Sequence, residues 1–435
     1  MRARPEVSPA SPRRKAQAME EVLFYGLVAL LVFGPLAFGA VEEWSVFVLR
    51  VTAILLVVLW AGLRAFAGRL TVIDNPLYLP MIAFALIVGT QYLFGLTAYG
   101  YATHEEALNY VAYGALMFVA AQVLHTPGAL RRFTIILSVV GFAIALFAIV
   151  QDFTSNGRIY WVRVPRFGGW IAGPYVNHNH YAGLMEMLIP MPLALGFHRS
   201  NLRSRSALLF FMATIMAASI FISQSRAGVM AFIIEMVLFG TMIFLRNRRR
   251  SIVIVAVLLV TVAFLGWLNT TQVFTRMQET HDLFRAHILR DGLVMFRQKP
   301  ILGWGFGTFP TVYPSFRSFY TNLFVNQAHN DILQVLVETG ALGFGVMIWF
   351  LVLVYRRGLS RGSSWDSRPG GLPQLAALVG VSGIVVHSFF DFNLHIPANA
   401  ALFYVLCVVA AEHVDGRTLS IRTARPRPAL VVDES

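Results

Sequence analysis

Charged residues are scarce in this sequence. Only 13% of its 435 residues are Asp, Glu, Lys or Arg, whereas a soluble domain usually contains about 25%. Hydrophobic residues make up 57% of the chain, and they gather in runs of about 16 to 23 residues, close to the length of a helix that crosses a bilayer. Because lipid offers the backbone no hydrogen-bonding partner, such runs cross it as helices. The composition therefore excludes a soluble globular domain and predicts an all-α integral membrane protein.

Cysteine and lysine are also nearly absent. Cys407 is the single cysteine, so no intrachain disulfide can form, and cysteine usage does not indicate the redox compartment. Lys15 and Lys299 are the only lysines, and the formal net charge of +13 therefore comes almost entirely from arginine. The basic N-terminal stretch shows no A-x-A-like cleavage site, so we expect the first apolar run to be retained rather than removed as a signal peptide.

The apolar segments predict about twelve transmembrane helices. We find no internal repeat among them. In chain order they cover 22–40, 45–62, 77–95, 107–124, 133–150, 181–197, 207–222, 228–245, 252–268, 332–354, 372–389 and 397–411.

Arginine placement predicts the orientation of these helices. If the first twenty residues are cytoplasmic, every second connection is arginine-rich, and the positive-inside bias then places both termini in the cytoplasm. We expect a disordered basic cytoplasmic tail over 1–20, a polytopic membrane domain over 21–412 and a cytoplasmic C-terminal tail over 413–435.

Ten basic residues fall on or near the outer side instead, mostly in two periplasmic segments at about 151–180 and 269–330. They either pair with lipid head groups and carboxylates or bind an anionic ligand, because the planar guanidinium fork matches phosphate oxygens. These residues are Arg158, Arg163, Arg166, Arg226, Arg276, Arg285, Arg290, Arg297, Lys299 and Arg317.

The second outer segment contains HDLFRAHILRDGLVMFRQKP. Its apolar residues recur at helical spacing, which predicts an amphipathic helix near the outer interface that Pro300 ends. The following ILGWGFGTFP is glycine-rich and predicts a loop. This loop lacks the strand–helix context of a phosphate-binding glycine loop.

Histidine and several polar residues open the tenth apolar segment, in NQAHNDILQVLVETG. Asn330 or Asp331 can cap the helix, and the positive end of the helix disfavours a charged imidazole at His329, which could then act as a base. Asp331 acts in the opposite direction, and a simple capping role for His329 remains the alternative. Glu338, about two turns into the helix, is expected to face the bundle interior or a cavity.

Three other polar groups draw attention. GPYVNHNHYAG opens the sixth segment, but no Cys or carboxylate accompanies its H-x-H at ligand spacing, so we prefer a hydrogen-bonded hairpin that orders a cavity rim, or a ligand contact, over a metal site. Asp391, Asn393 and His395 form another outer polar cluster. We interpret the acids Glu186 and Glu235, inside predicted helices, as buried structural partners before functional ones.

Taken together, these motifs resemble those of a known family. RAHILRDGLVMFRQKPILGWGFG looks like the stretch of O-antigen ligases and O-antigen polymerases in which an arginine precedes a P-x-x-G-x-G turn. Arg285-x3-Leu289 and His329-x10-Gly340 are similar to the family's R-x3-L and H-x10-G patterns. SQSRAG resembles its earlier arginine motif, and GPYVNHNHYAG its asparagine-containing motif.

The resemblance implies an inverting glycosyltransferase of the GT-C kind, without a metal or other cofactor, in the bacterial inner membrane. Its donor would be a glycan on undecaprenyl diphosphate at the periplasmic face. The acceptor would be a sugar hydroxyl of lipid A–core in a ligase, or of a lipid-linked repeat unit in a polymerase. The motif pair slightly favours a ligase, and the compact outer segment favours a polymerase.

The chemistry of such a transfer suggests roles for individual residues. Arg226 and Arg285 would stabilise the charge that develops on the departing diphosphate, and His329 would act as the general base on the acceptor hydroxyl. Further substrate-binding candidates are Arg163, Arg166, Arg290, Asn177, His180, Asn330 and Trp304, the last as a sugar-stacking residue or an interfacial anchor.

The expected partners are the lipid-linked donor, the glycan acceptor and membrane lipids. We expect no binding of nucleic acid. A transporter of an anionic solute or lipid is the alternative of another class, but it would show inverted repeats and matching broken helices, which the sequence lacks.

Overall fold

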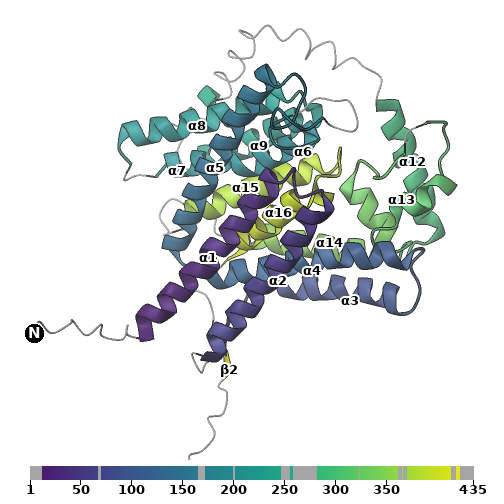
Figure 1. Ribbon diagram of the computed structural model, residues 1–435, viewed down its shortest axis with the longest axis horizontal. Helices are drawn as coiled ribbons and strands as arrows, with labels where there is room; N and C mark the ends of the chain where they lie inside the picture. The colour runs from purple at the N-terminus through teal and green to yellow at the C-terminus, as the bar shows by residue number, and fades with distance from the viewer. Residues whose placement is uncertain are drawn as a thin grey trace, which may run out of the picture.

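The computed structural model describes most of the chain as α-helix (Figure 1). The described residues are 12–66, 70–164, 172–198, 201–245, 255–257, 282–322, 324–360, 365, 370–412 and 418–421.

The helices follow the apolar segments of the sequence. They occupy eleven of the twelve predicted segments, and the other, 252–268, lies almost entirely outside the described residues. The first half contains α1 (Pro12–Leu36), α2 (Glu43–Phe66), α3 (Tyr78–Leu93), α4 (Gly100–Val123), α5 (Pro127–Thr154), α6 (His178–Leu188) and α7 (Pro190–Gly196). The second half contains α8 (Arg203–Ile222), α9 (Arg226–Phe244), α12 (Asp282–Gln298), α13 (Phe309–Val312), η1 (Tyr313–Ser315), α14 (Asp331–Ser360), α15 (Gly371–His387), η2 (Asn393–His395) and α16 (Pro397–Ala411).

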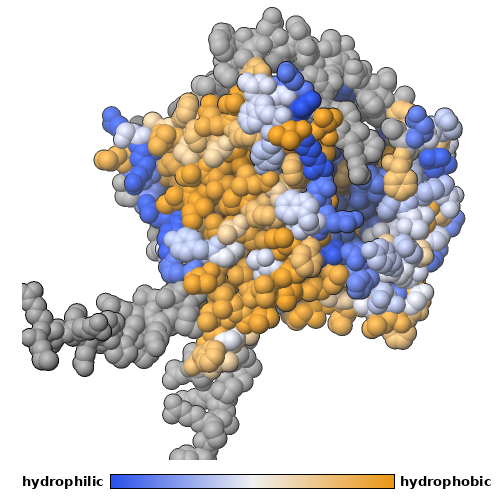
Figure 2. Space-filling model, in the orientation of Figure 1, coloured by the Kyte–Doolittle hydropathy of each residue, from blue (hydrophilic) through white to orange (hydrophobic). Residues whose placement is uncertain are grey.

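Five of these helices, α2, α5, α8, α9 and α14, are long and apolar enough to cross a membrane by length and composition, and α3, α15 and α16 are shorter apolar helices. The chain is thus a multi-pass membrane protein, while the number of twelve spans stays a prediction. Figure 2 shows a broad apolar surface over the bundle, and hydrophilic side chains gathered over the part that contains α12 and α13.

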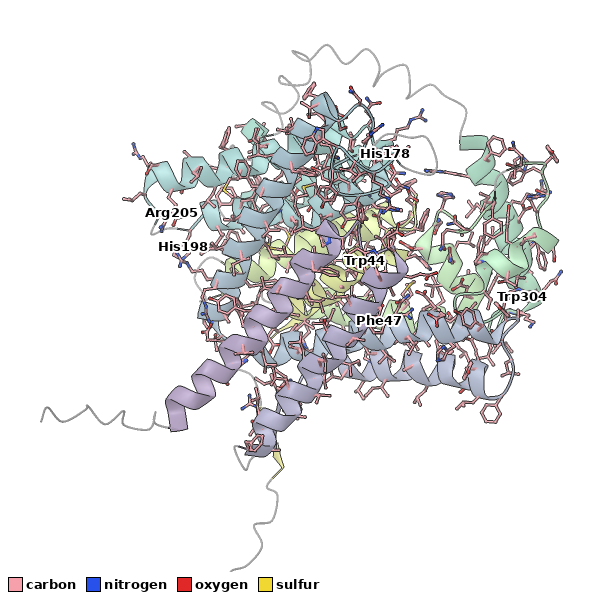
Figure 3. All side chains as sticks on the ribbon, in the orientation of Figure 1. Trp44, Phe47, His178, His198, Arg205 and Trp304 are labelled. Atoms are coloured by element: carbon pink, nitrogen blue, oxygen red, sulfur yellow. The ribbon has the colours of Figure 1, made fainter. Side chains whose placement is uncertain are left out.

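The two ends of the bundle differ in the side chains they carry. His198 and Arg205, around the start of α8, lie at one edge of the molecule, and Trp304, beside α12 and α13, lies at the opposite edge (Figure 3). The sequence predicted opposite sides of the membrane for these two segments. Which side is cytoplasmic stays a prediction.

Helices α15 and α16 form the centre of the bundle (Figure 1). Nearly every residue of both is buried, and many are alanine, glycine or valine. Small residues let helix backbones approach closely, which is how helices associate where no hydrophobic effect drives them together. The turn between α15 and α16, residues 388–396, is therefore held firmly, and it carries Asp391 and His395.

Helix α14 is kinked at Gly340, whose φ is 65°. A Cβ at this position would lie 2.3 Å from the carbonyl oxygen of Ile301, so only glycine fits both the conformation and the space. The kink lets the first part of α14 pack against α12, whose helical conformation the sequence periodicity predicted. The final glycine of the His329-x10-Gly340 pattern thus shapes the segment that His329 begins.

One feature of the fold was not predicted. Residues Leu70–Ile73 form strand β1, which pairs antiparallel with strand β2, Thr418–Ile421. Part of the C-terminal segment, expected to be a tail, is therefore fixed beside the connection between α2 and α3.

Candidate active site

A cavity of about 690 Å³ lies between the start of α9, α12, the residues before α14 and the turn after α15. We call it the arginine cavity. Its polar lining residues are Arg226, Arg285, His329 and Asn330, and its other lining residues are apolar, among them Met230, Ile233, Ile234, Leu289, Phe389 and Phe390. The structure thus brings the two arginines and the histidine that the sequence singled out to one space.

Helix α9 begins within the SQSRAG motif. The Ser225 hydroxyl accepts a hydrogen bond from the Gly228 amide (3.0 Å) and so caps the helix. A Cβ on Gly228 would lie 2.5 Å from the Cβ of Ala182, so this glycine permits close contact between α9 and α6. Cap and contact together fix Arg226, the first residue of α9, at the edge of the arginine cavity.

Asp391 is the centre of a buried hydrogen-bond network beside this cavity. Its Oδ1 lies 3.2 Å from Nδ1 of His329, and its Oδ2 accepts a hydrogen bond from Nδ2 of the Asn179 side chain. Oδ2 also lies 4.0 Å from Nη2 of Arg285, and Nη1 of Arg285 donates to the Phe390 carbonyl (3.0 Å). Asp391 therefore connects the histidine with one of the two arginines.

The network continues to the start of α9, the helix that begins with Arg226. The Ser225 hydroxyl donates to Oδ1 of Asn179 (2.7 Å), and Asn179 in turn donates to Asp391. Asn179, Ser225 and Asp391 are all buried. The start of α9, the start of α6 and the turn after α15 are thus joined through side chains.

Asp391 is held as a carboxylate. Its complete burial would raise the pKa of the carboxyl, but the hydrogen bond from His329 and the electrostatic interactions with His329, His180 and Arg285 lower that pKa well below its usual range. The negative charge of Asp391 is consequently available at neutral pH to orient His329 and to stabilise a proton on it.

His329 itself sits in the left-handed backbone region, with φ of 49°. Its ring packs edge-on against Phe392, with ring centres 5.0 Å apart. Because Nδ1 faces Asp391, a neutral ring carries its proton there and leaves Nε2 as the basic nitrogen. About 30% of the side chain is exposed, and the residue lines the arginine cavity.

Asp331 does not face His329. Its carboxylate binds Nδ1 of His395 (2.6 Å) and the Ser388 hydroxyl (2.8 Å). Burial would lower the pKa of His395, but the hydrogen bond and the charge of Asp331 raise it to about 9. Asn330 is the residue that caps α14, because its Oδ1 accepts from the Leu333 amide (2.9 Å). The two capping alternatives are thereby separated, and Asp391, not Asp331, is the acid beside His329.

Glu338 faces the interior, as expected, and has a structural role. Its carboxylate accepts hydrogen bonds from the amides of Gly307 (2.8 Å) and Phe309 (3.0 Å). It therefore holds the glycine loop that follows α12 against α14, away from the arginine cavity.

Several predicted substrate-binding residues lie elsewhere. Arg163 forms an ion pair with Glu42 and stacks on Phe38, with 4.4 Å from its guanidinium carbon to the ring centre. Arg290 is exposed on α12 and is not among the residues that line the cavity. Arg166 lies outside the described residues.

Trp304 also lies away from the cavity and packs inward. Its Nε1 donates to the Met295 carbonyl (2.9 Å), and the Lys299 amine lies 4.5 Å from its ring centre. These contacts use both the donor and one face of the indole, so Trp304 joins the glycine loop to α12.

The asparagine–histidine motif orders the back of the site. Asn177 caps α6, because its Oδ1 accepts a hydrogen bond from the backbone amide of Asn179 (2.8 Å). The buried His180 ring packs edge-on against Phe392, with ring centres 4.7 Å apart. Neither Asn177 nor His180 lines the arginine cavity. The motif residue that takes part in the network is Asn179, and no sequence pattern distinguishes it from its neighbours.

Comparison with protein families adds an independent observation. Residues 207–348 match the family described as O-antigen ligase. This range contains Arg226, Arg285, His329 and Gly340, while Asn179 and Asp391 lie outside it. No curated protein matches the chain. The match confirms the resemblance carried by the motifs: over these residues the chain is similar to the O-antigen ligase family, which indicates a membrane enzyme of the glycosyltransferase type.

Proposed function

We propose that this protein is an inverting, metal-independent glycosyltransferase of the O-antigen ligase kind. It would move a glycan from undecaprenyl diphosphate to a sugar hydroxyl of lipid A–core, at the periplasmic face of the bacterial inner membrane, with both termini cytoplasmic. The observation that carries the proposal is that Arg226, Arg285 and His329 line one cavity whose remaining wall, apart from Asn330, is apolar.

The arginine cavity suits an amphiphile with an anionic head. Arg226 and Arg285 supply two guanidinium groups, which bind phosphate oxygens in a fork geometry. Met230, Ile233 and Ile234 follow Arg226 along α9, and each is 38% to 46% exposed on the bundle surface. A diphosphate at the arginines would therefore continue into a hydrocarbon chain along α9.

His329 would activate the acceptor. Its Nε2 accepts the proton of the attacking hydroxyl, while Asp391 orients the ring and stabilises the imidazolium that forms. The hydroxyl oxygen forms a bond to the anomeric carbon as the bond to the diphosphate breaks on the opposite face, which inverts the configuration. The electron pair leaves on the diphosphate, and Arg226 and Arg285 stabilise the added charge. The arginines provide the electrophilic assistance that a metal gives in other transferases.

Polymerisation of lipid-linked repeat units is the second candidate. The described part of the segment between α12 and α14 packs compactly against both helices, because its Phe309, Val312 and Tyr313 belong to one buried cluster with residues of α12 and α14. A compact segment of this kind favours a polymerase. The chemical roles of Arg226, Arg285 and His329 are the same in both reactions.

Deletion of the gene tests the proposal. Lipopolysaccharide and free polysaccharide from the deletion strain are separated on one gel, and the strain is complemented with wild type or with His329→Ala. Loss of polymer on lipid A–core, with accumulation of lipid-linked polymer, is the expected result, and single repeat units without polymer would show a polymerase. Full complementation by His329→Ala at normal abundance would refute the role of His329 as the base.

A further inference from the structure

The aliphatic and aromatic side chains of the arginine cavity lie on different walls. The aliphatic side chains belong mostly to α9 and α12, among them Ile233, Ile234 and Leu289. The two phenyl rings that line the cavity, Phe389 and Phe390, belong instead to the turn after α15. These residues are 52% and 39% exposed, so the protein leaves two large ring surfaces accessible on one wall of the cavity.

Both rings are carried by a firmly held backbone. The side-chain amide of Asn330 donates to the Phe389 carbonyl (3.0 Å), and Nη1 of Arg285 donates to the Phe390 carbonyl (3.0 Å). The backbone amides of the two phenylalanines donate to carbonyls at the end of α15. All four backbone polar groups are therefore paired before any ligand binds, which reduces the entropy that binding costs.

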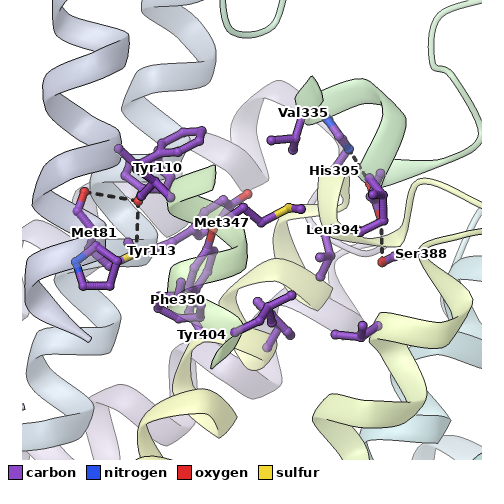
Figure 4. Close-up of a pocket in the computed structure, with 18 of the residues that line it drawn as sticks. Met81, Tyr110, Tyr113, Val335, Met347, Phe350, Ser388, Leu394, His395 and Tyr404 are labelled. Carbon is purple, nitrogen blue, oxygen red and sulfur yellow. Dashed lines mark hydrogen bonds and ion pairs between the residues drawn. The ribbon is translucent and has the colours of Figure 1, made fainter. Parts of the chain in front are cut away.

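The turn is also fixed from its other side. Ser388 donates to the Asp331 carboxylate (2.8 Å), which in turn binds Nδ1 of His395 (2.6 Å) (Figure 4). These three residues line a separate cavity of about 110 Å³, whose lining does not include either phenyl ring. Neighbouring residues of the turn thus face different cavities, and 389 and 390 are the ones that face the arginine cavity.

The two rings lie where the transferred sugar has to be. Asp391, which orients His329, follows Phe390 directly in the chain. Arg285 is bonded to the carbonyl of Phe390. In an inverting transfer the anomeric carbon lies between the acceptor hydroxyl, at the histidine, and the diphosphate, at the arginines. The sugar that contains this carbon consequently occupies the part of the cavity beside the phenyl rings, whereas the prenyl chain continues along α9.

The chemistry of this wall suits a sugar. The C–H bonds on a pyranose face carry a small positive charge, and the face of an aromatic ring is negative. An aliphatic wall, such as that of α9, is sufficient for a prenyl chain. Trp304, the sugar-stacking candidate from the sequence, packs inward. Among the described residues that line the arginine cavity, Phe389 and Phe390 are therefore the aromatic residues that can stack on a sugar.

We propose that Phe389 and Phe390 bind the first sugar of the donor, the one attached to the diphosphate, by stacking on its ring. The inference rests on the proposed function and adds to it the residues that recognise the transferred glycan. Arginines then bind the diphosphate, aliphatic residues of α9 bind the prenyl chain, and the turn after α15 binds the sugar.

Lipid binding to the purified, delipidated full-length protein tests the proposal. The affinity for undecaprenyl diphosphate is compared with that for the same lipid carrying one N-acetylglucosamine, glucose or galactose. The ratio of affinities isolates the contribution of the sugar. For wild type we expect at least one of the glycosylated lipids to bind about tenfold more tightly than undecaprenyl diphosphate. Equal affinities for all four lipids would overturn the proposal, because the sugar would then add nothing to binding.

Variants assign this gain to the two rings. Phe390→Leu removes the aromatic face, keeps an apolar side chain and should lose most of the sugar-dependent gain. Its affinity for undecaprenyl diphosphate should stay unchanged, because Arg285 bonds to the backbone carbonyl and not to the ring. Phe389→Leu should behave in the same way, and Phe390→Tyr should recover the gain. Phe47 is 66% exposed on α2 and does not line the cavity, so Phe47→Leu is the matched control.

The outcomes separate the possible roles of the rings. Equal weakening of the glycosylated and the sugar-free lipid by Phe390→Leu would show contact with the prenyl chain or the phosphates, and would refute sugar stacking. Wild-type affinity for every lipid in both leucine variants would refute it as well. Retained binding of undecaprenyl diphosphate shows that a variant is folded, and Phe389→Leu provides the test if Phe390→Leu does not fold. A wild-type protein that binds none of the lipids would contradict the proposed function itself, which distinguishes that failure from the loss of sugar stacking alone.

Discussion

The hydroxyl of Ser225 donates a 2.7 Å hydrogen bond to the side-chain oxygen of Asn179. Asn179 in turn donates to Asp391, which holds His329. Ser225 also caps the helix that begins with Arg226. One asparagine therefore links the arginine that faces the proposed diphosphate to the carboxylate that orients the proposed base.

Asn179→Ala should lower kcat about 10- to 100-fold, because a hydrogen bond to a charged group contributes about 1.5–3 kcal/mol and the carboxylate would lose one of its donors. We expect KM for the donor to change little and the pH–rate profile to shift, since Asp391 would orient and stabilise the imidazolium less well. Asn201, near the far edge of the bundle, donates to the Leu195 carbonyl (2.7 Å), and Asn201→Ala serves as the control. A pH–rate profile in Asn179→Ala that is the same as that of wild type would contradict the positioning role, whatever the value of kcat.

Arg285 provides a test of phosphate recognition. Arg285→Ala should lose donor binding, and Arg285→Lys should recover only part of it, because an ammonium group cannot make the paired contacts of a guanidinium. Arg290 lies on the same helix, is exposed and does not line the cavity, so Arg290→Lys should bind the donor as wild type does. Donor affinity is measured by titration of purified protein with undecaprenyl phosphate. Wild-type affinity in Arg285→Lys would argue against the fork contact.

Sequence patterns predicted the helices and the local motifs, because each of these lies within one short stretch of the chain. Apolar runs marked the helices, the period of 281–300 marked α12, and the arginine and histidine motifs marked three residues that share one cavity. A helix-sized apolar run or a local motif is contained in one stretch of chain, so its signal is complete in the sequence. The chemical roles of these residues stay predictions.

What the sequence did not reveal depends on partners far apart along the chain. Asp391 lies 62 residues from His329, and only the return of α15 to the start of α14 brings them together. The sequence predicts Arg163 as a substrate-binding residue, whereas the structure pairs it with Glu42, which lies 121 residues earlier in the chain. Charge and residue type are the same in both environments, so composition alone cannot distinguish a ligand site from an ion pair.

Gly340 tests the link between the kink in α14 and the site. Gly340→Ala should destabilise the protein by several kcal/mol, because alanine disfavours a φ of 65° and its Cβ would lie 2.3 Å from a backbone oxygen. Gly345 lies five residues further along the same helix, and a Cβ there would meet nothing within 4 Å. Gly345→Ala should therefore be neutral or slightly stabilising. Thermal unfolding in detergent measures both, and equal melting temperatures for the two variants would show that the kink is not required.

The Asp331–His395 pair should make the protein less stable as the pH becomes alkaline. The folded-state pKa of His395 is about 9, above the value near 6.5 expected for an unfolded chain. The pair's contribution is thus fully present below about pH 6.5 and is lost as the pH rises through about 9. We expect the melting temperature to fall between pH 7 and 10, and His395→Gln to fall less steeply from a lower starting value. His287, exposed on α12, is the control, because His287→Gln should keep the wild-type slope. Parallel curves for wild type and His395→Gln would mean that the buried pair contributes no pH-dependent stability.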